Sequence, residues 1–354
     1  MDYEKPTSRA LQSNWQGTLR QADGTQSPSS PQIAIIGIGE TGNTAVSQLG
    51  KLKGQNVRTI TINPHLFQLE KSDQEKATMV ENKLDKALDE TDIVLLATCL
   101  THDLETKVAS KIARTAKKKA VTTVGVAANL TPLRGDESVL TSKSLRELQK
   151  ECDMVILVNS QDLMELVPKI PLEEIMNITA HTLTSVITGL VETFSAPNLP
   201  DSSLNSYRTL LESGGLAVAG IGESNIADGV EEAVYNALEN VRSGQLLDVG
   251  FHKARGAFIH VAGSTETAIE EANRVERTLQ KLMEEKSSVF WEVRVNPDLK
   301  GRVRAMLVMA GTATPVSSKW NLGSLAGELH NLELNSEPDK KLPIDFELYQ
   351  MENF

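Results

Sequence analysis

The stretch PQIAIIGIGETGNTAV, residues 31–46, places an apolar run directly before three glycines and the start of an amphipathic helix. The glycines are Gly37, Gly39 and Gly42. A strand, a glycine-rich turn and a helix in this order aim backbone N–H groups and the positive end of a helix dipole at one point, which favours a phosphate. A P-loop would continue with Lys and Ser or Thr after the last glycine, but Asn43 stands there. What the glycines hold therefore depends on the rest of the chain.

The composition is that of an acidic chain without a membrane segment. Its 354 residues are enough for two domains, and a formal net charge of −11 argues against nucleic acid as the main partner. No apolar run approaches the roughly 20 residues of a membrane span, and the N-terminus has no signal-peptide core. We therefore predict a cytoplasmic protein. Cys99 and Cys152 lie beside apolar runs without metal-ligand spacing, so we expect buried thiols and no metal site.

Apolar runs and helical stretches alternate after a polar N-terminal tail. Residues 1–30 are rich in Ser, Gln, Gly and Pro and are predicted to be disordered. In residues 31–172, apolar runs of strand length alternate with amphipathic stretches such as 104–118, which predicts a Rossmann-like α/β domain with a parallel sheet covered on both faces. The expected strands are 33–38, 57–62, 92–98, 120–126 and 153–158.

A long helix separates this region from a second one. Residues 173–194 read as one helix with apolar positions on more than one face, so we expect burial on both sides of a core helix at 173–197. Residues 198–316 are predicted to form a smaller α+β domain with its own mixed sheet, and 317–354 a flexible linker with a docking peptide. The expected elements of the second domain are helices at 203–212 and 228–242 and strands at 256–263, 289–296 and 302–311.

One interpretation of GIGETG is the dinucleotide-binding turn of an NAD-dependent oxidoreductase. That fingerprint needs an acidic residue at the end of the second strand to bind the ribose. Here the strand ends in TINPH, with Asn63 and His65 in that place. Because no His or Tyr-Lys arrangement supports hydride chemistry either, this is the least favoured alternative.

Several segments together resemble the FtsZ/tubulin family in order and spacing, from about residue 31 to 315. GIGETGNTAV resembles the first nucleotide loop of FtsZ, G-x-G-G-x-G-N-x-A-V, with Glu40 in place of a glycine. TINPHLFQL resembles the second loop, and residues 214–238 resemble a G-x-A-x-x-G-x-G segment followed by a helix. Residues 246–264 and 289–312 are similar to the last sheet of the family.

The resemblance implies a nucleotide, a filament and a set of site residues. It implies GTP or GDP as cofactor and head-to-tail self-association, in which the loop after the core helix enters the site of the next subunit. In that loop the catalytic positions correspond to Asn198 and, one residue late, Asp201. The nucleotide-binding positions correspond to Gly37, Gly39, Glu40, Thr41, Gly42, Asn43, Asn63, Asn129 and Ser160.

The segment that should grip the phosphates departs from this pattern. FtsZ has G-G-G-T-G-T-G after its third strand, whereas this chain reads TCLTHDLET at 98–106, without glycine. Glycine is needed there so that successive backbone N–H groups can point at phosphate oxygens. Asp103 and Glu105 would also oppose a phosphate electrostatically, and His102 is more typical of a surface or capping residue than of a ligand.

The catalytic loop and the base contacts depart as well. The family reads N-x-D-x-x-D after the core helix, and this chain has Pro200 and Ser203 at the two aspartate positions. Asp201, Ser202 or Ser203 is therefore expected to cap the following helix, with water activation as the alternative role of Asp201. The core-helix aspartate that pairs with guanine falls near Asn177 or His181, neither of which offers a carboxylate.

These observations predict an FtsZ-like cytoskeletal protein that forms or joins filaments, in cell division or a related membrane or shape process, with weak or absent GTP hydrolysis. An active GTPase that uses Asp201 and a regulator that caps the filaments of a true FtsZ partner remain alternatives. The terminal LPIDFE resembles the peptide by which archaeal-type FtsZ proteins bind a membrane-tethering adaptor. Residues 342–349 are thus a candidate docking motif, and an incidental hydrophobic tail is the alternative.

Overall fold

The computed structural model describes residues 31–49, 52, 56–67, 82, 84–129, 136–159, 171–195, 210–211, 215–242, 247–249, 254–263, 288–296, 299–311 and 313–315. The two predicted tails and most of the predicted helix at 203–212 lie outside these residues.

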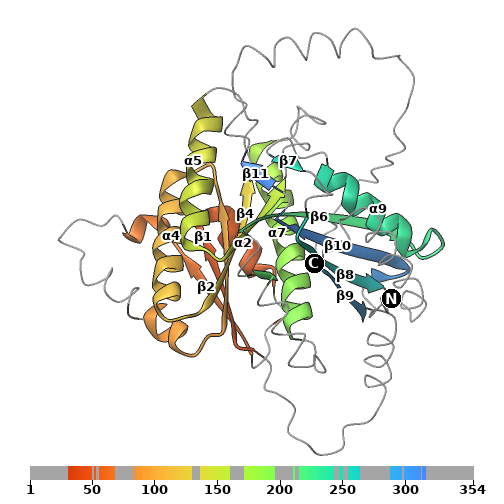
Figure 1. Ribbon diagram of the computed structural model, residues 1–354, viewed down its shortest axis with the longest axis horizontal. Coiled ribbons are helices and arrows are strands. Elements are labelled where there is room, and N and C mark those ends of the chain that lie inside the picture. The colour runs from red at the N-terminus through yellow and green to blue at the C-terminus, as the bar shows by residue number, and fades with distance from the viewer. Residues whose placement is uncertain are drawn as a thin grey trace, which may run out of the picture. The chain divides into compact units, whose positions relative to one another are not determined.

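A nine-stranded sheet with the order β2-β1-β3-β4-β5-β6-β10-β8-β9 organises the described residues (Figure 1). Its neighbours pair in parallel except at β10, which runs antiparallel to both β6 and β8. The sequence-based strands are confirmed within three residues at each end. The strands are β1 (Ile33–Ile38), β2 (Val57–Ile62), β3 (Ile93–Cys99), β4 (Thr122–Asn129), β5 (Met154–Asn159), β6 (Gly215–Asn225), β8 (Gly256–Gly263), β9 (Ser288–Val295) and β10 (Arg302–Ala310), with β7 (Leu247–Val249) and β11 (Ala313–Pro315) in a separate pair.

Helices cover both faces of this sheet, as the alternating pattern predicts. The helices α4, α5 and α9 contribute to one buried cluster, and α2 and α7 contribute to the other. Successive side chains of a strand point to opposite faces, so Ile36 and Ile38 of β1 belong to the first cluster and Ile33 and Ile35 to the second. The helices are α2 (Gly39–Ser47), α4 (Asp103–Lys118), α5 (Asp136–Glu151), α7 (Leu172–Phe194) and α9 (Gly229–Arg242), with a short 3-10 turn η2 (Pro64–Phe67).

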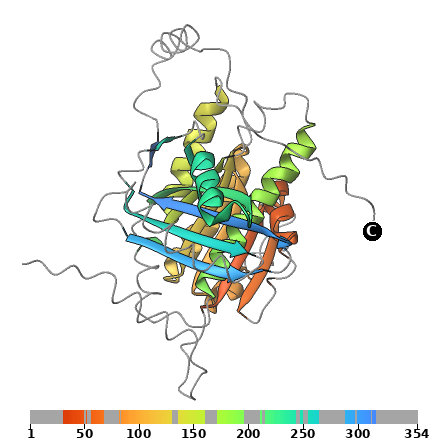
Figure 2. The same ribbon diagram turned by 90° about the vertical axis from the view of Figure 1, so that its right-hand side faces the viewer.

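The sheet continues across the junction where a second sheet was expected. β5 pairs in parallel with β6, with Met154 opposite Gly215, and β6 pairs with β10. The predicted mixed pairing is confirmed in β6, β10, β8 and β9, but these strands continue the first sheet, because strand pairing, which local sequence does not encode, joins the two regions. Figure 2 shows β10, β8 and β9 lying side by side in blue and teal. The domain boundaries at 172 and 198 stay predictions.

The long helix α7 is buried around much of its circumference. Glu173, Glu174, Asn177 and His181 are exposed near its start, but every side chain at 182–195 is buried or half-buried. This confirms the expectation of burial on more than one face. Among the described residues, no helix combines the length and apolar character that a membrane span requires.

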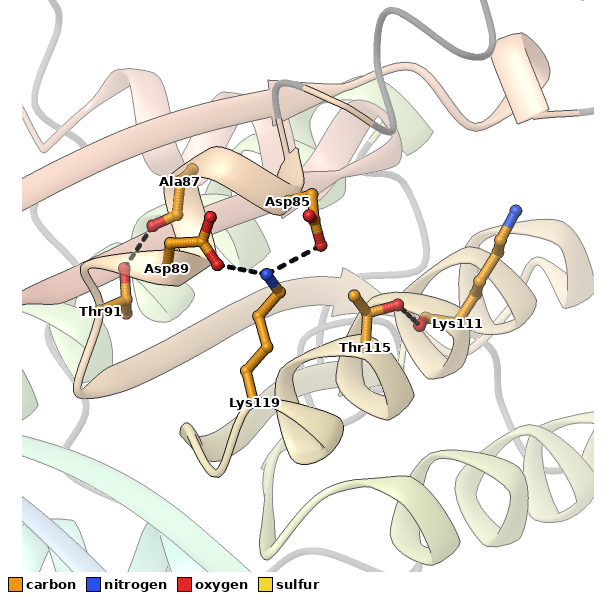
Figure 3. Close-up of polar contacts among 7 residues, drawn as sticks. All are labelled: Asp85, Ala87, Asp89, Thr91, Lys111, Thr115 and Lys119. Carbon is orange, nitrogen blue, oxygen red and sulfur yellow. Dashed lines mark hydrogen bonds and ion pairs between the residues drawn. The ribbon is translucent and has the colours of Figure 1, made fainter.

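A polar cluster ties the end of α4 to the segment that precedes β3. Lys119 Nζ lies 3.0 Å from Asp85 Oδ1 and also contacts Asp89, while Thr91 Oγ1 donates a 2.6 Å hydrogen bond to Ala87 O (Figure 3). Thr122 N donates to the carbonyl of Asp92 at the start of the neighbouring strand. These contacts lie at the amino ends of β3 and β4 and leave the carboxyl ends to the loops of the site.

Candidate functional site

The carboxyl ends of the parallel strands form the candidate site. In the order β2-β1-β3, the chain leaves β1 toward one side for β2 and reaches β3 on the other side. Such a switch point is where open α/β sheets bind ligands, since the loops on either side diverge there. The turn after β1 and the connection after β3 meet at this point.

The turn after β1 is packed tightly by the protein's own atoms. A methyl group at Gly37 would lie 2.6 Å from Gly42 O, and one at Gly42 would lie 2.2 Å from Ala97 O of β3. Gly39 has a φ of +76°, and a methyl group there would lie 2.1 Å from the carboxyl carbon of Glu105. The conformation and the close approaches therefore require glycine at these positions even without a phosphate.

The other residues of the first loop are placed as follows. Thr41 is buried and Glu40 is exposed. Asn43 donates from Nδ2 to Ile62 O and accepts from Ile62 N, each at 3.1 Å. The side chain of Asn43 thus holds the end of β2 beside α2, which gives this matched residue a structural role.

The remaining predicted site residues fall in separate places. Asn63 follows β2, is exposed and accepts a 3.0 Å hydrogen bond from His65 N, so it stabilises its own turn. Asn129 is fully buried at the end of β4. Ser160, Asn198 and Asp201 lie outside the described residues.

The connection after β3 is too short for a glycine-rich phosphate loop. β3 ends at Cys99 and α4 begins at Asp103, so only residues 100–102 lie between them. Leu100 is fully buried and its N–H donates to Ala128 O. His102 precedes the helix, is exposed and makes no side-chain capping bond, in agreement with a surface role.

Glu105, whose charge was expected to oppose a phosphate, is buried beside the glycine turn. It lies in the first turn of α4 and is 8% exposed. Its Oε2 has no hydrogen-bond partner within the described part of the chain. Burial raises the pKa of Glu105 to about 7, the backbone N–H of Cys99 opposes this rise, and the charge of Glu40 adds to it.

The helix α7 connects the candidate site to the C-terminal strands. Thr184 Oγ1 lies 3.0 Å from Ala45 O of α2, within hydrogen-bond distance. Near the other end, Glu192 Oε2 lies 2.9 Å from His260 Nε2 of β8, and Arg294 of β9 donates to Glu192 O at 2.8 Å. Asn177 and His181, the nearest matches to the guanine-binding position, are both exposed.

The two cysteines were expected to be buried thiols, and Cys99 also donates its backbone N–H to Glu105. Both are buried, as predicted, and neither forms a disulfide. Burial raises the pKa of the Cys152 thiol, which keeps it protonated and unreactive.

The fold and this site define a doubly wound α/β protein with a glycine turn, a central helix and a further set of strands in the same sheet. Residues 215–313 match the family described as "FtsZ family, C-terminal domain". The chain is 25% identical over 308 residues to "Cell division protein FtsZ 2" of Methanocaldococcus jannaschii, which covers 80% of this chain and 81% of that protein. The chain belongs to the FtsZ/tubulin superfamily.

Solved structures agree with this assignment at the level of the fold. The structure "FtsZ dimer, empty" from M. jannaschii has a TM-score of 0.68 at 24% identity and covers 88% of this chain and 94% of that one. "CetZ2 from Haloferax volcanii - GTPgS bound protofilament" has a TM-score of 0.60 at 17% identity and covers 85% and 99%.

Sequence reasoning missed the contact between Glu105 and Gly39. It recognised Glu105 as a charge unfavourable to phosphate but did not place it on the glycine turn. The short distance between the apolar run at 92–98 and the helical stretch at 104–118 was a partial signal. Side chains in a helix lean toward its N-terminus, so Glu105 points back toward the loops at the ends of the strands.

Proposed function

We propose that this chain is an FtsZ-like cytoskeletal protein that forms or joins head-to-tail filaments in the cytoplasm and hydrolyses GTP weakly or not at all. The observation that carries this proposal is the three-residue connection between β3 and α4, which leaves no glycine-rich loop to surround phosphates. The process it serves is cell division or a related membrane or shape function, in keeping with the relatives named as cell division proteins.

The FtsZ-like fold is present although the phosphate loop is not, and this supports assembly as the function that the chain performs. A head-to-tail contact is heterologous and open, so it builds a filament and needs the fold more than it needs catalysis. The CetZ2 structure described as a protofilament supports this reading through its similar fold. In our proposal residues 342–349 bind a membrane-tethering adaptor through their apolar side chains.

The oxidoreductase alternative has no supporting observation. Asn63 occupies the position of the ribose-binding acid and uses its Oδ1 to bind His65 N. A carboxylate that could bind both ribose hydroxyls is therefore missing at the end of β2.

The test combines nucleotide binding, turnover and assembly on the full chain. We expect calorimetric titration with GTP and then GDP to give weak or no binding, and phosphate release to stay near background as the protein concentration rises. Pelleting and negative-stain microscopy should show filaments of the chain alone or with an FtsZ-type partner.

The Asp201→Ala variant separates this proposal from an active GTPase. If phosphate release rises with protein concentration and is lost in Asp201→Ala, the chain is a GTPase that uses a shared site, and the weak-hydrolysis proposal is wrong. If neither the chain alone nor a mixture with an FtsZ-type partner assembles, the cytoskeletal part of the proposal is wrong.

A further inference from the structure

Glu105 is an unusual residue to bury at the switch point of the sheet. It is 8% exposed, its Oε2 has no hydrogen-bond partner among the described residues, and the backbone N–H of Cys99 is its hydrogen-bond donor. A buried carboxyl group without a cation is costly, and an apolar residue would pack there at lower cost. The charge that acts on it most is that of Glu40, which has the same sign.

The carboxyl group of Glu105 lies directly over the glycine turn. An added Cβ at Gly39 would lie 2.1 Å from its Cδ and Oε1 and 2.5 Å from its Oε2. Helix α2 begins at Gly39, so the first N–H groups of a nine-residue helix lie at the same end. That end of a helix favours an anionic or strongly polar group.

Three facts thus coincide at one point: the glycine geometry that suits a phosphate, the start of α2, and a carboxyl group contributed by α4. Any side chain at Gly39 would collide with the carboxyl group of Glu105, so this contact alone requires glycine there. The glycine motif can therefore persist in this chain without a bound nucleotide.

We propose that Glu105 is a built-in occupant of the anion position at the glycine turn, so that a phosphate-bearing ligand can enter only when this side chain withdraws. The inference rests on the proposed function, because it names the residue that withholds the turn from nucleotide. It depends on the weak nucleotide binding in that proposal and does not depend on whether the chain forms filaments.

A double-mutant cycle tests the contact without nucleotide or assembly. Gly39→Ala, Glu105→Ala and the double variant of the full chain would be unfolded in urea. The strain from the positive φ is common to both backgrounds and cancels, so we expect the penalty of Gly39→Ala on the folding equilibrium constant to be at least about tenfold smaller when Glu105 is Ala. An equal penalty in both backgrounds would overturn the proposal.

Ligand binding tests the consequence and stays informative if Gly39→Ala does not fold. The probes are pyrophosphate and GDP, titrated calorimetrically into the wild-type chain and into Glu105→Ala. We expect Glu105→Ala to bind both at least about tenfold more tightly, because the volume over the glycine turn becomes available to a phosphate.

Two matched controls distinguish the effect of the volume of the Glu105 side chain from the effect of its charge. Glu105→Gln removes the charge and keeps the volume, and Asp103→Asn removes a charge from the same helix turn; both should bind like the wild type. The proposal would be overturned if Glu105→Ala bound the probes no more tightly than the wild type. It would also be overturned if Glu105→Gln or Asp103→Asn gained as much affinity as Glu105→Ala. Filament formation would be unaffected by any of these outcomes, so a failure of the proposed function remains distinguishable.

Discussion

At Gly42 the first helix approaches β3 so closely that one methyl group decides whether the two elements fit. A Cβ there would lie 2.2 Å from Ala97 O, a backbone atom that cannot rotate away. At Gly301, by contrast, φ is +87° and no atom lies within 4 Å of an added Cβ. The two glycines are therefore required for different reasons, close approach at Gly42 and backbone conformation at Gly301.

We expect Gly42→Ala to lower the free energy of unfolding by about 3 kcal/mol, since overpacking against backbone forces α2 away from β3. Gly301→Ala should lower it by only about 1–2 kcal/mol, from the positive φ alone. Urea unfolding of both variants measures the difference. Equal losses would contradict the close approach.

The second residue-scale prediction concerns Glu105 and pH. Burial raises its pKa from 4.5 to about 7, so the folded state retains a proton that the unfolded chain has lost between these values. The stability linked to this proton is fully present below about pH 4.5 and is lost as the pH rises through about 7. Glu105→Gln does not titrate, so its stability relative to the wild type should rise by about 2–3 kcal/mol between pH 4.5 and pH 8.

Unfolding curves of the two proteins at the two pH values provide the measurement, and the comparison cancels the other titrating groups. A difference between wild type and Glu105→Gln that does not change with pH would mean that the carboxyl group is accessible to water.

At the scale of elements, α7 is the part that links the candidate site to the C-terminal strands. Thr184 contacts the carbonyl of Ala45 on α2, and Glu192 pairs with His260 on β8. Burial would raise the pKa of Glu192, but the close His260 side chain and the charges of Arg294 and Arg304 lower it overall. A carboxylate with a lowered pKa contributes stability above its unfolded value and loses it as the pH falls through its folded value.

Glu192→Gln should therefore be less stable than the wild type near neutral pH by about 1–3 kcal/mol, because one partner of a largely buried pair is removed. The gap should close as the pH falls below about 4.5, where the wild-type carboxylate takes up its proton. Thermal or urea unfolding at several pH values measures this trend. Glu231→Gln, at an exposed position of α9, is the control for loss of an exposed carboxylate, and its effect should be smaller than that of Glu192→Gln near neutral pH.

At the scale of the whole molecule, assembly and targeting should be separable properties. The proposed assembly would use the part of the chain that resembles FtsZ, about residues 31–315, whereas the proposed adaptor site is the peptide at 342–349. Deletion of residues 342–354 should leave filaments in a pelleting assay unchanged and should redistribute a fluorescent fusion in cells, since short apolar motifs act by docking to a partner.

A double substitution, Ile344→Ser with Phe346→Ser, tests whether the apolar side chains are responsible and keeps the length of the chain. It should behave like the deletion. Unchanged localisation of both variants would remove the tail from the proposed function.

The sequence by itself determined most of the elements. The strand at 33–38 and the helix at 173–194 were predicted to within one residue, because burial on both faces of a parallel sheet leaves continuous apolar runs and helix periodicity is local. The order of several motifs also indicated the superfamily, since spacing over some 280 residues is far more specific than a single glycine loop.

Only the tertiary structure decided three features: the pairing of β5 with β6, the bond of Asn43 to Ile62, and the position of Glu105 on Gly39. The partners in these contacts are 19 to 66 residues apart, and the local sequence around one partner does not predict the other. The glycine turn was predicted correctly, but what fills it depends on how α4 packs across the switch point, and that packing is a property of the assembled sheet.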